Sequence, residues 1–324
     1  MGIDKVKSTG KFGRVAILMG GPSTEREISL KSGRAVYESL KNLGLDAVVI
    51  DITTDNPDEN IRLIKAQKPD CIFIALHGRF GEDGQIQEIL DKIDIPYTGS
   101  GRLASHLAMD KAASMPIFEI HDLDVPRYKV MEDIYYNPGW KVYNSLGFPL
   151  VIKPAAHGSS IGLSIIDSAQ GLDQAVALAF SFDSKIIIQE YIRGREITVG
   201  ILDERPLPII EIMPKNKFFD YEAKYQAGMT DYVVPAQLNE AVAKKVQGAA
   251  LSAHKLLGCF GCSRVDMILG LDNRPFILEV NTIPGFTQTS LLPKSAKVAG
   301  IDFTQLCLKL IELAYEKAKN KSCV

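Results

Sequence analysis

The chain of 324 residues contains 46% hydrophobic and 23% charged residues, a composition typical of globular proteins. Its length predicts about two or three domains. The formal net charge of -2 and the pI near 6.2 argue against nucleic acid or an anionic membrane surface as a partner held by bulk charge. Small molecules are therefore the expected partners.

Three absences in the sequence predict where the protein resides. No apolar run approaches the roughly 18 residues of a membrane span. Residues 1–13 lack the apolar centre of a signal peptide. Five cysteines, an odd number at scattered positions, favour a reducing compartment over a disulfide framework. We expect a cytoplasmic protein with no membrane partner.

The N-terminal region predicts a strand, a loop and a helix. Residues 1–13 are polar, and we expect them to form a loose leader that contributes nothing to the core. The apolar run Val15–Met19 ends in two glycines, and a helical pattern follows. Thr24 and Glu27 fit a capping box at the start of that helix. Glu25 is then left either to bind a ligand or to be a first-turn carboxylate favoured by the helix dipole.

Alternating β and α segments continue to about residue 100. Ala47–Ile52 and Cys71–Leu76 read as strands, and Asp58–Gln67 reads as the helix between them. This alternation predicts a Rossmann-like parallel sheet in an N-terminal α/β domain, residues 14–111. Ligands bind beyond the carboxyl ends of such strands, where the Gly-rich loop His77–Gly84 begins. His77 is therefore a candidate site residue.

Residues 112–197 predict a smaller α+β domain of short strands separated by Gly/Pro turns. The expected strands and helix are Tyr128–Val130, Leu150–Lys153, Gly162–Ile166 and Lys185–Gln189, with a helix at Leu172–Phe180. Lys153 ends a strand that leads into a Gly/Ser loop, His157–Ile161. Backbone N–H groups and hydroxyls in such a loop can bind an anion.

Two short motifs have alternative explanations. The run from Gly158 to Gly162 matches G-x-S-x-G, but that hydrolase motif requires a following helix, and a strand-like segment follows instead. Cys259 and Cys262 match half of a zinc or redox pattern, with no second pair to complete it. We favour an ordinary loop and two half-buried thiols.

Residues 198–324 predict a third domain that contains a β-hairpin. A long helix (Glu240–Leu257) and a closing helix (Phe303–Lys319) flank the hairpin and the residues after it. The apolar runs Val265–Leu269 and Phe276–Val280 would be its two strands.

The hairpin would place four polar residues on one face. Centring its turn on Asp272–Asn273 puts Asp266 opposite Glu279 and Arg264 opposite Asn281. A solvated face of a half-buried hairpin is one explanation. However, opposed carboxylates destabilise a sheet unless a cation lies between them. We therefore favour a Mg²⁺ site whose remaining ligands are water and phosphate.

The common nucleotide fingerprints are absent from the sequence. There is no G-x-x-x-x-G-K-[ST], and Gly20-Gly21 does not extend to G-x-G-x-x-G. Lys111, Lys153, the Gly/Ser loop and the carboxylate hairpin nevertheless supply cations, backbone donors and metal ligands. These are the requirements of phosphoryl transfer.

Several separated segments, in this order, resemble the D-alanine–D-alanine ligases of the ATP-grasp family. They are G-G-P-S-T-E-R-E-I-S-L-K-S-G, A-L-H-G-R-F-G-E-D-G, P-Y-T-G-S-G, M-D-K, I-K-P, G-S-S-I-G, D-Y-E-A-K-Y, G-C-S-R-V-D and L-E-V-N-T-I-P-G-F-T. The resemblance runs from about Arg14 to Tyr315. It implies an ATP-grasp fold after the N-terminal domain. The implied activity is ATP-dependent joining of two D-alanines through a D-alanyl phosphate, for peptidoglycan precursor synthesis.

The resemblance also assigns residues to ATP and to two Mg²⁺ (or Mn²⁺) ions. Contacts to ATP fall on Lys111, Lys153, Ser160, Glu190, Tyr191, Ile192, Glu196 and Lys224. The metal ligands fall on Asp266, Glu279 and Asn281.

For the amino-acid substrates, the resemblance implies that Glu25 binds the ammonium group of the first D-alanine, with His77 nearby. Arg264 and the Gly285 N–H would stabilise the tetrahedral oxyanion. Ser290 and Leu291 would receive the carboxylate of the second D-alanine. Ser159, Lys224 and Tyr225 would close a loop over the site. Phe218–Tyr225 would then act as a lid that excludes water.

One position departs from the family pattern. Many of its members have Glu where this chain has His157, which puts the hydrogen bond of that carboxylate in question. Tyr225 matches the members that form dipeptides. The alternatives are a related ligase with another second substrate, such as D-serine, and a nucleotide-binding regulatory protein without turnover. The resemblance also implies a homodimer.

Overall fold

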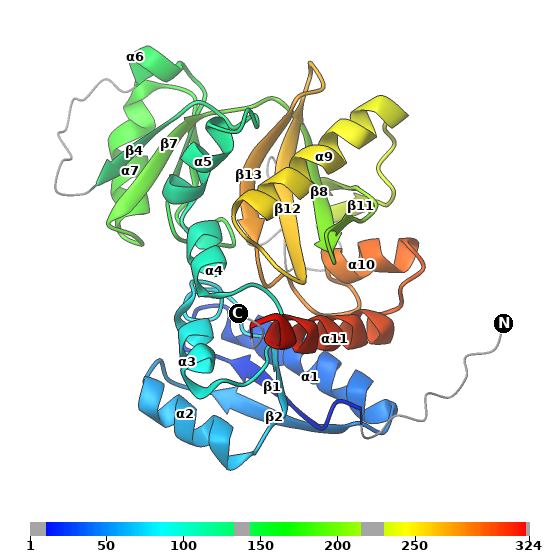
Figure 1. Ribbon diagram of the computed structural model, residues 1–324. Helices are drawn as coiled ribbons and strands as arrows, with labels where there is room; N and C mark the ends of the chain where they lie inside the picture. Colours follow the sequence, from blue (N-terminus) through cyan, green and yellow to red (C-terminus); the bar gives the residue numbers. More distant parts are fainter. Residues whose placement is uncertain (1–10, 133–142, 215–229, 322–324) are drawn as a thin grey trace.

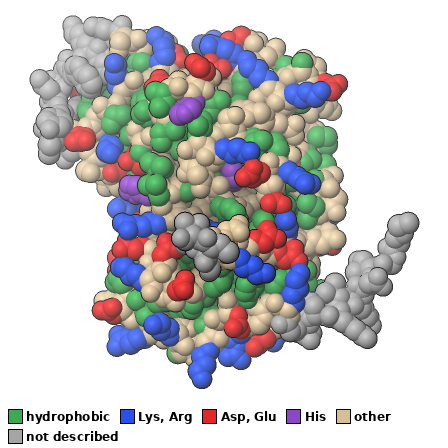
Figure 2. All heavy atoms as spheres, viewed as in Figure 1, with side chains coloured by type: hydrophobic (Ala, Val, Ile, Leu, Met, Phe, Trp, Pro, Cys, Tyr) green, Lys and Arg blue, Asp and Glu red, His purple; other side chains and the backbone are tan. Residues whose placement is uncertain are grey.

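The computed structural model describes residues 11–132, 143–214 and 230–321 (Figure 1). Figure 1 shows a blue N-terminal unit at one end of the molecule and two further sheets, one green and one yellow to orange, side by side at the other. In these described ranges no helix is both long and apolar enough to cross a membrane. The charged side chains of both signs are interspersed on the face drawn in Figure 2.

The N-terminal sheet is parallel, as the sequence predicts, with the strand order β2-β1-β3. Its strands are β1 (Arg14–Gly20), β2 (Asp46–Ile52) and β3 (Cys71–Ile74). Its helices are α1 (Arg26–Asn42), α2 (Pro57–Ala66) and α3 (Gln85–Ile93). Strand β1 is central and almost wholly buried, which explains its unbroken apolar sequence.

Residues from the beginning and the end of the described chain meet in the core of this unit. Helices α10 (Leu291–Val298) and α11 (Phe303–Lys321) supply buried side chains to the same cluster as β1. Phe12 also belongs to it, with 5% of its surface exposed, and its ring stacks on Tyr315 at 6.2 Å between centroids. The expectation that residues 1–13 contribute nothing to the core is therefore wrong at Phe12, which covers apolar surface that a three-stranded sheet leaves open.

The second sheet is antiparallel and has the order β4-β7-β5-β6. Its strands are β4 (Tyr128–Glu132), β5 (Leu150–Pro154), β6 (Ser164–Ile166) and β7 (Lys185–Glu190). Helix α7 (Leu172–Phe180) packs against it, with α6 (Tyr143–Leu146) and a 3-10 turn (Ala169–Gly171) nearby. The predicted strands and helix of this region are confirmed, with shifts of up to two residues at strand ends.

The third sheet has six strands, with β11-β10-β8-β12-β13 in order and β9 paired to β8. The strands are β8 (Gly194–Leu202), β9 (Arg205–Pro206), β10 (Ile210–Pro214), β11 (Thr230–Val233), β12 (Cys262–Gly270) and β13 (Pro275–Asn281). Three helices contribute to its apolar core: α4 (Arg102–Met109), α5 (Lys111–Glu119) and α9 (Glu240–Leu256). Helices α4 and α5 were not predicted.

The predicted pairing of β12 with β13 is confirmed where it matters for the site. Asp266 lies opposite Glu279, and Arg264 lies opposite Asn281. Beyond that point the prediction is wrong, because Met267 pairs with Ile277.

Two irregularities with opposite effects on the register explain this result. The turn is closed by a hydrogen bond from Gly270 N to Arg274 O at 2.9 Å, and Asn273 has a φ of 60°. A three-residue turn with one left-handed residue fits this geometry better than the predicted two-residue turn. A β-bulge at Leu278 then restores the register before Glu279. The bulge leaves Leu278 and Glu279 both partly exposed, and both line a cavity.

The observed elements cross two of the expected domain boundaries. Strand β8 runs through the boundary between residues 197 and 198, and α5 begins at Lys111, one residue before the expected central domain. We infer that the domain built on the third sheet begins at Gly194, the first residue of β8. Helix α11, expected in the C-terminal domain, packs against the N-terminal sheet.

Candidate active site

Two cavities lie between these three units and meet at shared residues. Cavity 1, of about 350 Å³, extends from the start of α1 to the β12–β13 hairpin. Cavity 2, of about 490 Å³, lies between the second and third sheets. Lys111 and Glu279 line both. A third cavity of about 320 Å³ adjoins them, sharing Glu25 with cavity 1 and His157 with cavity 2.

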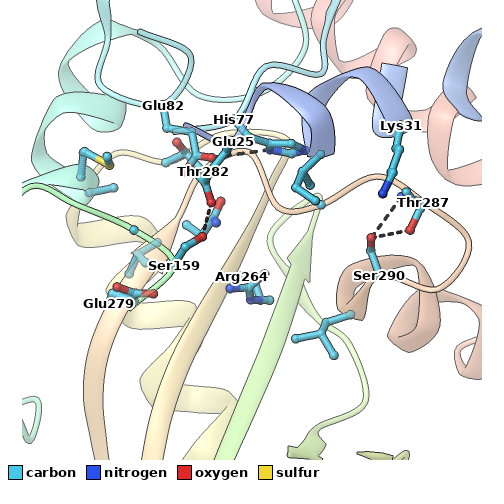
Figure 3. A pocket seen from close by; sticks show the side chains of 18 of the residues that line it. Glu25, Lys31, His77, Glu82, Ser159, Arg264, Glu279, Thr282, Thr287 and Ser290 are labelled. Carbon is cyan, nitrogen blue, oxygen red and sulfur yellow. Dashed lines mark hydrogen bonds and ion pairs between the residues drawn. The ribbon is translucent and has the colours of Figure 1, made fainter. Parts of the chain in front are cut away.

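Glu25 lies at the N-terminal end of α1 and faces cavity 1 (Figure 3). The predicted capping box is wrong, because Glu25 occupies the N-cap position and no side chain caps the helix. Ser23 organises this turn instead: its hydroxyl donates to His77 O at 2.6 Å and accepts from Glu25 N at 3.2 Å. Ser159 donates a hydrogen bond to the Glu25 carboxylate. Gly78 has a φ of 71°, which favours glycine, and a Cβ there would lie 2.7 Å from Glu25 Oε2.

His77 is buried, and both of its ring nitrogens have protein partners. Nε2 lies 2.9 Å from Ser32 Oγ, and Nδ1 lies 3.2 Å from Ile283 O. Glu82 Oε1 is 3.6 Å from Nδ1 and accepts a hydrogen bond from Gly78 N at 3.0 Å. Burial raises the pKa of the Glu82 carboxyl, and its interaction with His77 opposes that shift. His77 lines cavity 1, but its nitrogens are engaged in fixing the cavity wall.

Two cation–carboxylate pairs lie where the cavities meet. Arg264 binds Asp266 through Nε and Nη2 at 2.9 and 2.7 Å. Lys111, only 4% exposed, lies 3.0 Å from Glu279 Oε2 and donates to His157 O at 2.9 Å. The site thus concentrates two positive groups and two carboxylates around one position. This is an arrangement suited to an anion together with a metal.

The donor chemistry of the hairpin fits Mg²⁺. Asp266 and Glu279 offer carboxylate oxygens, and Asn281 Oδ1 accepts a hydrogen bond from Ile283 N at 2.9 Å while keeping a second lone pair. Within the described part of the chain, no group of three or more His, Cys, Asp or Glu side chains is placed to hold a metal. Water and phosphate would complete the shell, as is usual for Mg²⁺.

Cavity 2 is lined by apolar and polar side chains together. Six of the predicted nucleotide residues line it: Lys111, Lys153, Ser160, Tyr191, Ile192 and Glu196. Glu190 is absent from this lining, and its carboxylate binds Arg127 Nε at 2.7 Å and Arg127 N at 2.9 Å. Successive residues of a strand point to opposite faces. In β7 the residue facing the cavity is therefore Gln189, not Glu190.

Gln189 was not predicted from the sequence. It is 3% exposed, and its Oε1 atom has no hydrogen-bond partner among the residues that the structure describes. An unpaired buried acceptor is costly unless a ligand satisfies it. Side chains alternate between the two faces of β7, and this alternation is the sequence signal that could have identified Gln189.

The far end of cavity 1 is formed by the loop before α10. Ser290 Oγ accepts from Thr287 N at 3.1 Å and lies 2.8 Å from Thr287 Oγ1. A Cβ on Gly285 would lie 2.9 Å from Ser290 Oγ, so a larger residue there would displace the Ser290 hydroxyl. Figure 3 also shows Lys31 pointing toward Thr287 and Ser290. Lys31 lies within the segment G-G-P-S-T-E-R-E-I-S-L-K-S-G, but it was not predicted as a site residue.

The Gly/Ser loop between β5 and β6 separates the cavities. Ser159 lines cavity 1 and Ser160 lines cavity 2, and both adopt positive φ, 56° and 57°. Burial lowers the pKa of His157, although Asp183 opposes the shift. The expected contacts of Lys224 and Tyr225, and the proposed lid Phe218–Tyr225, lie outside the described residues.

Two antiparallel sheets enclosing a cavity, with lysines on one side and carboxylates on the other, define the ATP-grasp class of enzymes. The profile "D-ala D-ala ligase C-terminus" matches residues 117–312, and "D-ala D-ala ligase N-terminus" matches residues 55–100. The chain is 45% identical to the D-alanine–D-alanine ligase of Pelotomaculum thermopropionicum, over 94% of this chain and 97% of that protein.

Solved structures agree with these matches. The Bacillus anthracis D-alanine–D-alanine ligase complexed with ATP is 34% identical, with a TM-score of 0.84 over 95% of this chain and 99% of its own. The VanG D-Ala:D-Ser ligase of Enterococcus faecalis is 32% identical, with a TM-score of 0.80 over 94% of this chain and 100% of its own. The chain belongs to the D-alanine–D-alanine ligase family. It is an ATP-dependent ligase.

Proposed function

We propose that this protein joins two D-alanine molecules to D-alanyl-D-alanine while converting ATP to ADP and phosphate. The observation that supports the proposal most strongly is the meeting of two cavities at Lys111 and Glu279. Cavity 2 is suited to a nucleotide, and cavity 1 is suited to small zwitterions. The terminal phosphate and the amino-acid carboxylate would therefore meet beside these two side chains.

In the first step, a carboxylate oxygen of the first D-alanine attacks the γ-phosphorus, and the bond between this phosphorus and the ADP oxygen breaks. Glu25 holds the ammonium group, and Lys111 and Lys153 neutralise phosphate oxygens. Two Mg²⁺ or Mn²⁺ ions, held by Asp266, Glu279 and Asn281, would supply further neutralisation of the phosphates. The product is a D-alanyl phosphate.

In the second step, the amine of the second D-alanine attacks the acyl carbon. A carbon–nitrogen bond forms, the bond between the acyl carbon and the phosphate oxygen breaks, and the departing phosphate takes the proton that the nitrogen loses. The Arg264 guanidinium and the Gly285 N–H stabilise the oxyanion that develops on the carbonyl oxygen. Ser290 and the Leu291 N–H, at the start of α10, bind the second carboxylate.

The nucleotide is held along β7 and β8. Gln189 Oε1 accepts a hydrogen bond from the exocyclic amine of adenine, which satisfies an otherwise unpaired acceptor. Tyr191 and Ile192 pack against the base, and Glu196 binds the ribose hydroxyls. Ser160 contacts the phosphates from its loop.

A D-serine acceptor is the second candidate, since the chain resembles a D-Ala:D-Ser ligase at a TM-score of 0.80. Relatives at 43–46% identity are named D-alanine–D-alanine ligase, which favours alanine. We place the reaction in the cytoplasm, as a step of peptidoglycan precursor synthesis by a homodimer.

The test is to incubate the purified protein with ATP, Mg²⁺ and D-alanine, measuring phosphate release and dipeptide by mass spectrometry. We expect one phosphate per dipeptide and no reaction when EDTA removes the metal. Competition among D-alanine, D-serine and D-lactate would identify the acceptor. Absence of both phosphate and dipeptide would reject the proposal.

A further inference from the structure

The loop Thr282–Phe286 is anchored on both sides of Gly285. Before the glycine, Ile283 O lies 3.2 Å from His77 Nδ1, and Ile283 N donates to Asn281 Oδ1 at 2.9 Å. After it, the Phe286 ring is buried edge-on against Phe73, with the centroids 5.3 Å apart. Between these anchors, Gly285 lines cavity 1.

One buried hydroxyl connects the two anchors. Ser32 Oγ, on α1, lies 3.2 Å from Phe286 N and 2.9 Å from His77 Nε2. The Phe286 N–H can only donate, so Ser32 accepts from it and has its own proton available for His77 Nε2. His77 then carries its proton on Nδ1 and donates it to Ile283 O. The chain of donors runs in one direction from Phe286 to Ile283.

We propose that Ser32 is a positioning residue, which acts through Phe286 and His77 to hold the Gly285 N–H toward the reacting carbonyl. The inference rests on the proposed function, because it is the oxyanion of that reaction that the N–H would stabilise. Ser32 is itself fully buried and is not part of the cavity lining. Any effect of its removal on the reaction must therefore pass through the loop.

A purely structural role for Ser32 is the competing explanation, since buried hydroxyls are normally hydrogen-bonded. The chain contains a close match for comparison. Ser29, one turn earlier on α1, is equally buried and also makes two hydrogen bonds, donating to Ala75 O and accepting from Gly20 N, both at 2.8 Å. Both partners of Ser29 belong to the N-terminal unit, and neither belongs to the Gly285 loop.

The experiment compares Ser32→Ala with Ser29→Ala in the full-length protein. Each is expected to lose stability by a similar small amount, measured by urea unfolding. Only Ser32→Ala is expected to lower kcat for dipeptide formation, by about tenfold to a hundredfold, because a misplaced donor loses its effect on the transition state. The KM for ATP should stay within about twofold, since cavity 2 does not contact this loop.

A second measurement separates positioning from loss of fold. A phosphinate analogue of the dipeptide, which imitates the tetrahedral intermediate, should bind Ser32→Ala more weakly and Ser29→Ala as tightly as the wild type. Equal kcat and equal analogue affinity in the two variants would overturn the inference and leave the proposed function standing. A wild-type protein that made no dipeptide would refute the proposed function, and this inference with it.

Discussion

At the scale of single residues, four charged side chains of the site form two ion pairs. Lys111 is bound to Glu279, and Arg264 is bound to Asp266, at distances between 2.7 and 3.0 Å. In the proposed reaction, a triphosphate would offer the cations new partners, and Mg²⁺ would offer the carboxylates new partners. Binding would then exchange one set of pairs for another and leave no buried charge uncompensated. The Glu279 carboxylate would be needed in both states.

The first prediction concerns this carboxylate. Glu279→Gln should lower kcat by at least about 100-fold, because it removes charge from the metal site without changing size. The amide oxygen still accepts from Lys111, so the protein should remain folded by circular dichroism.

Glu240→Gln is the matched control. Glu240 also pairs with a lysine, Lys244, at 2.6 Å, but on the exposed face of α9. It should keep the wild-type rate. A Glu279→Gln protein with wild-type turnover would exclude a catalytic metal held by this carboxylate.

Gln189 provides the second prediction. Gln189→Leu removes the buried acceptor, and the KM for ATP should rise about fivefold to twentyfold with kcat nearly unchanged, as expected for one lost hydrogen bond of about 1–2 kcal/mol. Steady-state kinetics with ATP as the varied substrate measure this.

Glu190→Gln serves as its control on the same strand. The Glu190 side chain binds Arg127, so the KM for ATP should not change. A larger effect from Glu190→Gln than from Gln189→Leu would contradict the assignment from the strand geometry.

At the scale of elements, sequence patterns located most of the secondary structure that carries the site. Apolar runs predicted β1, β2, β5 and the hairpin, because each strand has a buried face. Helices α4 and α5 were missed, since both are short and α5 contains Pro116. The register next to the hairpin turn was predicted wrongly because neither the three-residue turn nor the compensating bulge at Leu278 could be identified from this single sequence.

Helix α9 carries a histidine whose burial makes stability depend on pH. His254 is 1% exposed and lies 2.7 Å from Ser263 Oγ, and burial lowers its pKa to about 4. The unfolded chain takes up this proton near pH 6.5, before the folded protein does. The contribution of neutral His254 is therefore complete above about pH 6.5 and is lost as the pH falls from 6.5 toward 4.

The third prediction follows from that sign. The free energy of unfolding of the wild type should fall between pH 7 and pH 4.5 by up to about 2–3 kcal/mol more than that of His254→Asn. Urea unfolding at several pH values measures the difference. His121→Asn, at an exposed histidine, should follow the wild type. Parallel pH curves for the wild type and His254→Asn would show that another group is responsible.

At the scale of the whole molecule, the site exists only because three units meet. Glu25 comes from the N-terminal unit, Lys153 from the second sheet and Glu279 from the third. The sequence identified these residues through their motifs, but it could not show which of them line the same cavity. Nor could it show that α11 returns to cover the first sheet, because that depends on contacts between distant parts of the chain.

The last prediction tests whether a nucleotide joins the second and third sheets. A non-hydrolysable ATP analogue with Mg²⁺, at 100 times its Kd, should stabilise the wild type by about 2.7 kcal/mol and raise its Tm in a thermal-shift series. Lys153→Met should lose about half of this gain if its affinity falls tenfold. Lys129→Met removes a lysine from β4 of the same sheet, at an exposed position outside cavity 2, and should keep the full gain. Equal shifts in both variants would mean that the nucleotide is not held from the β5 side, whereas a smaller shift only in Lys153→Met would show that the second sheet binds the nucleotide through Lys153.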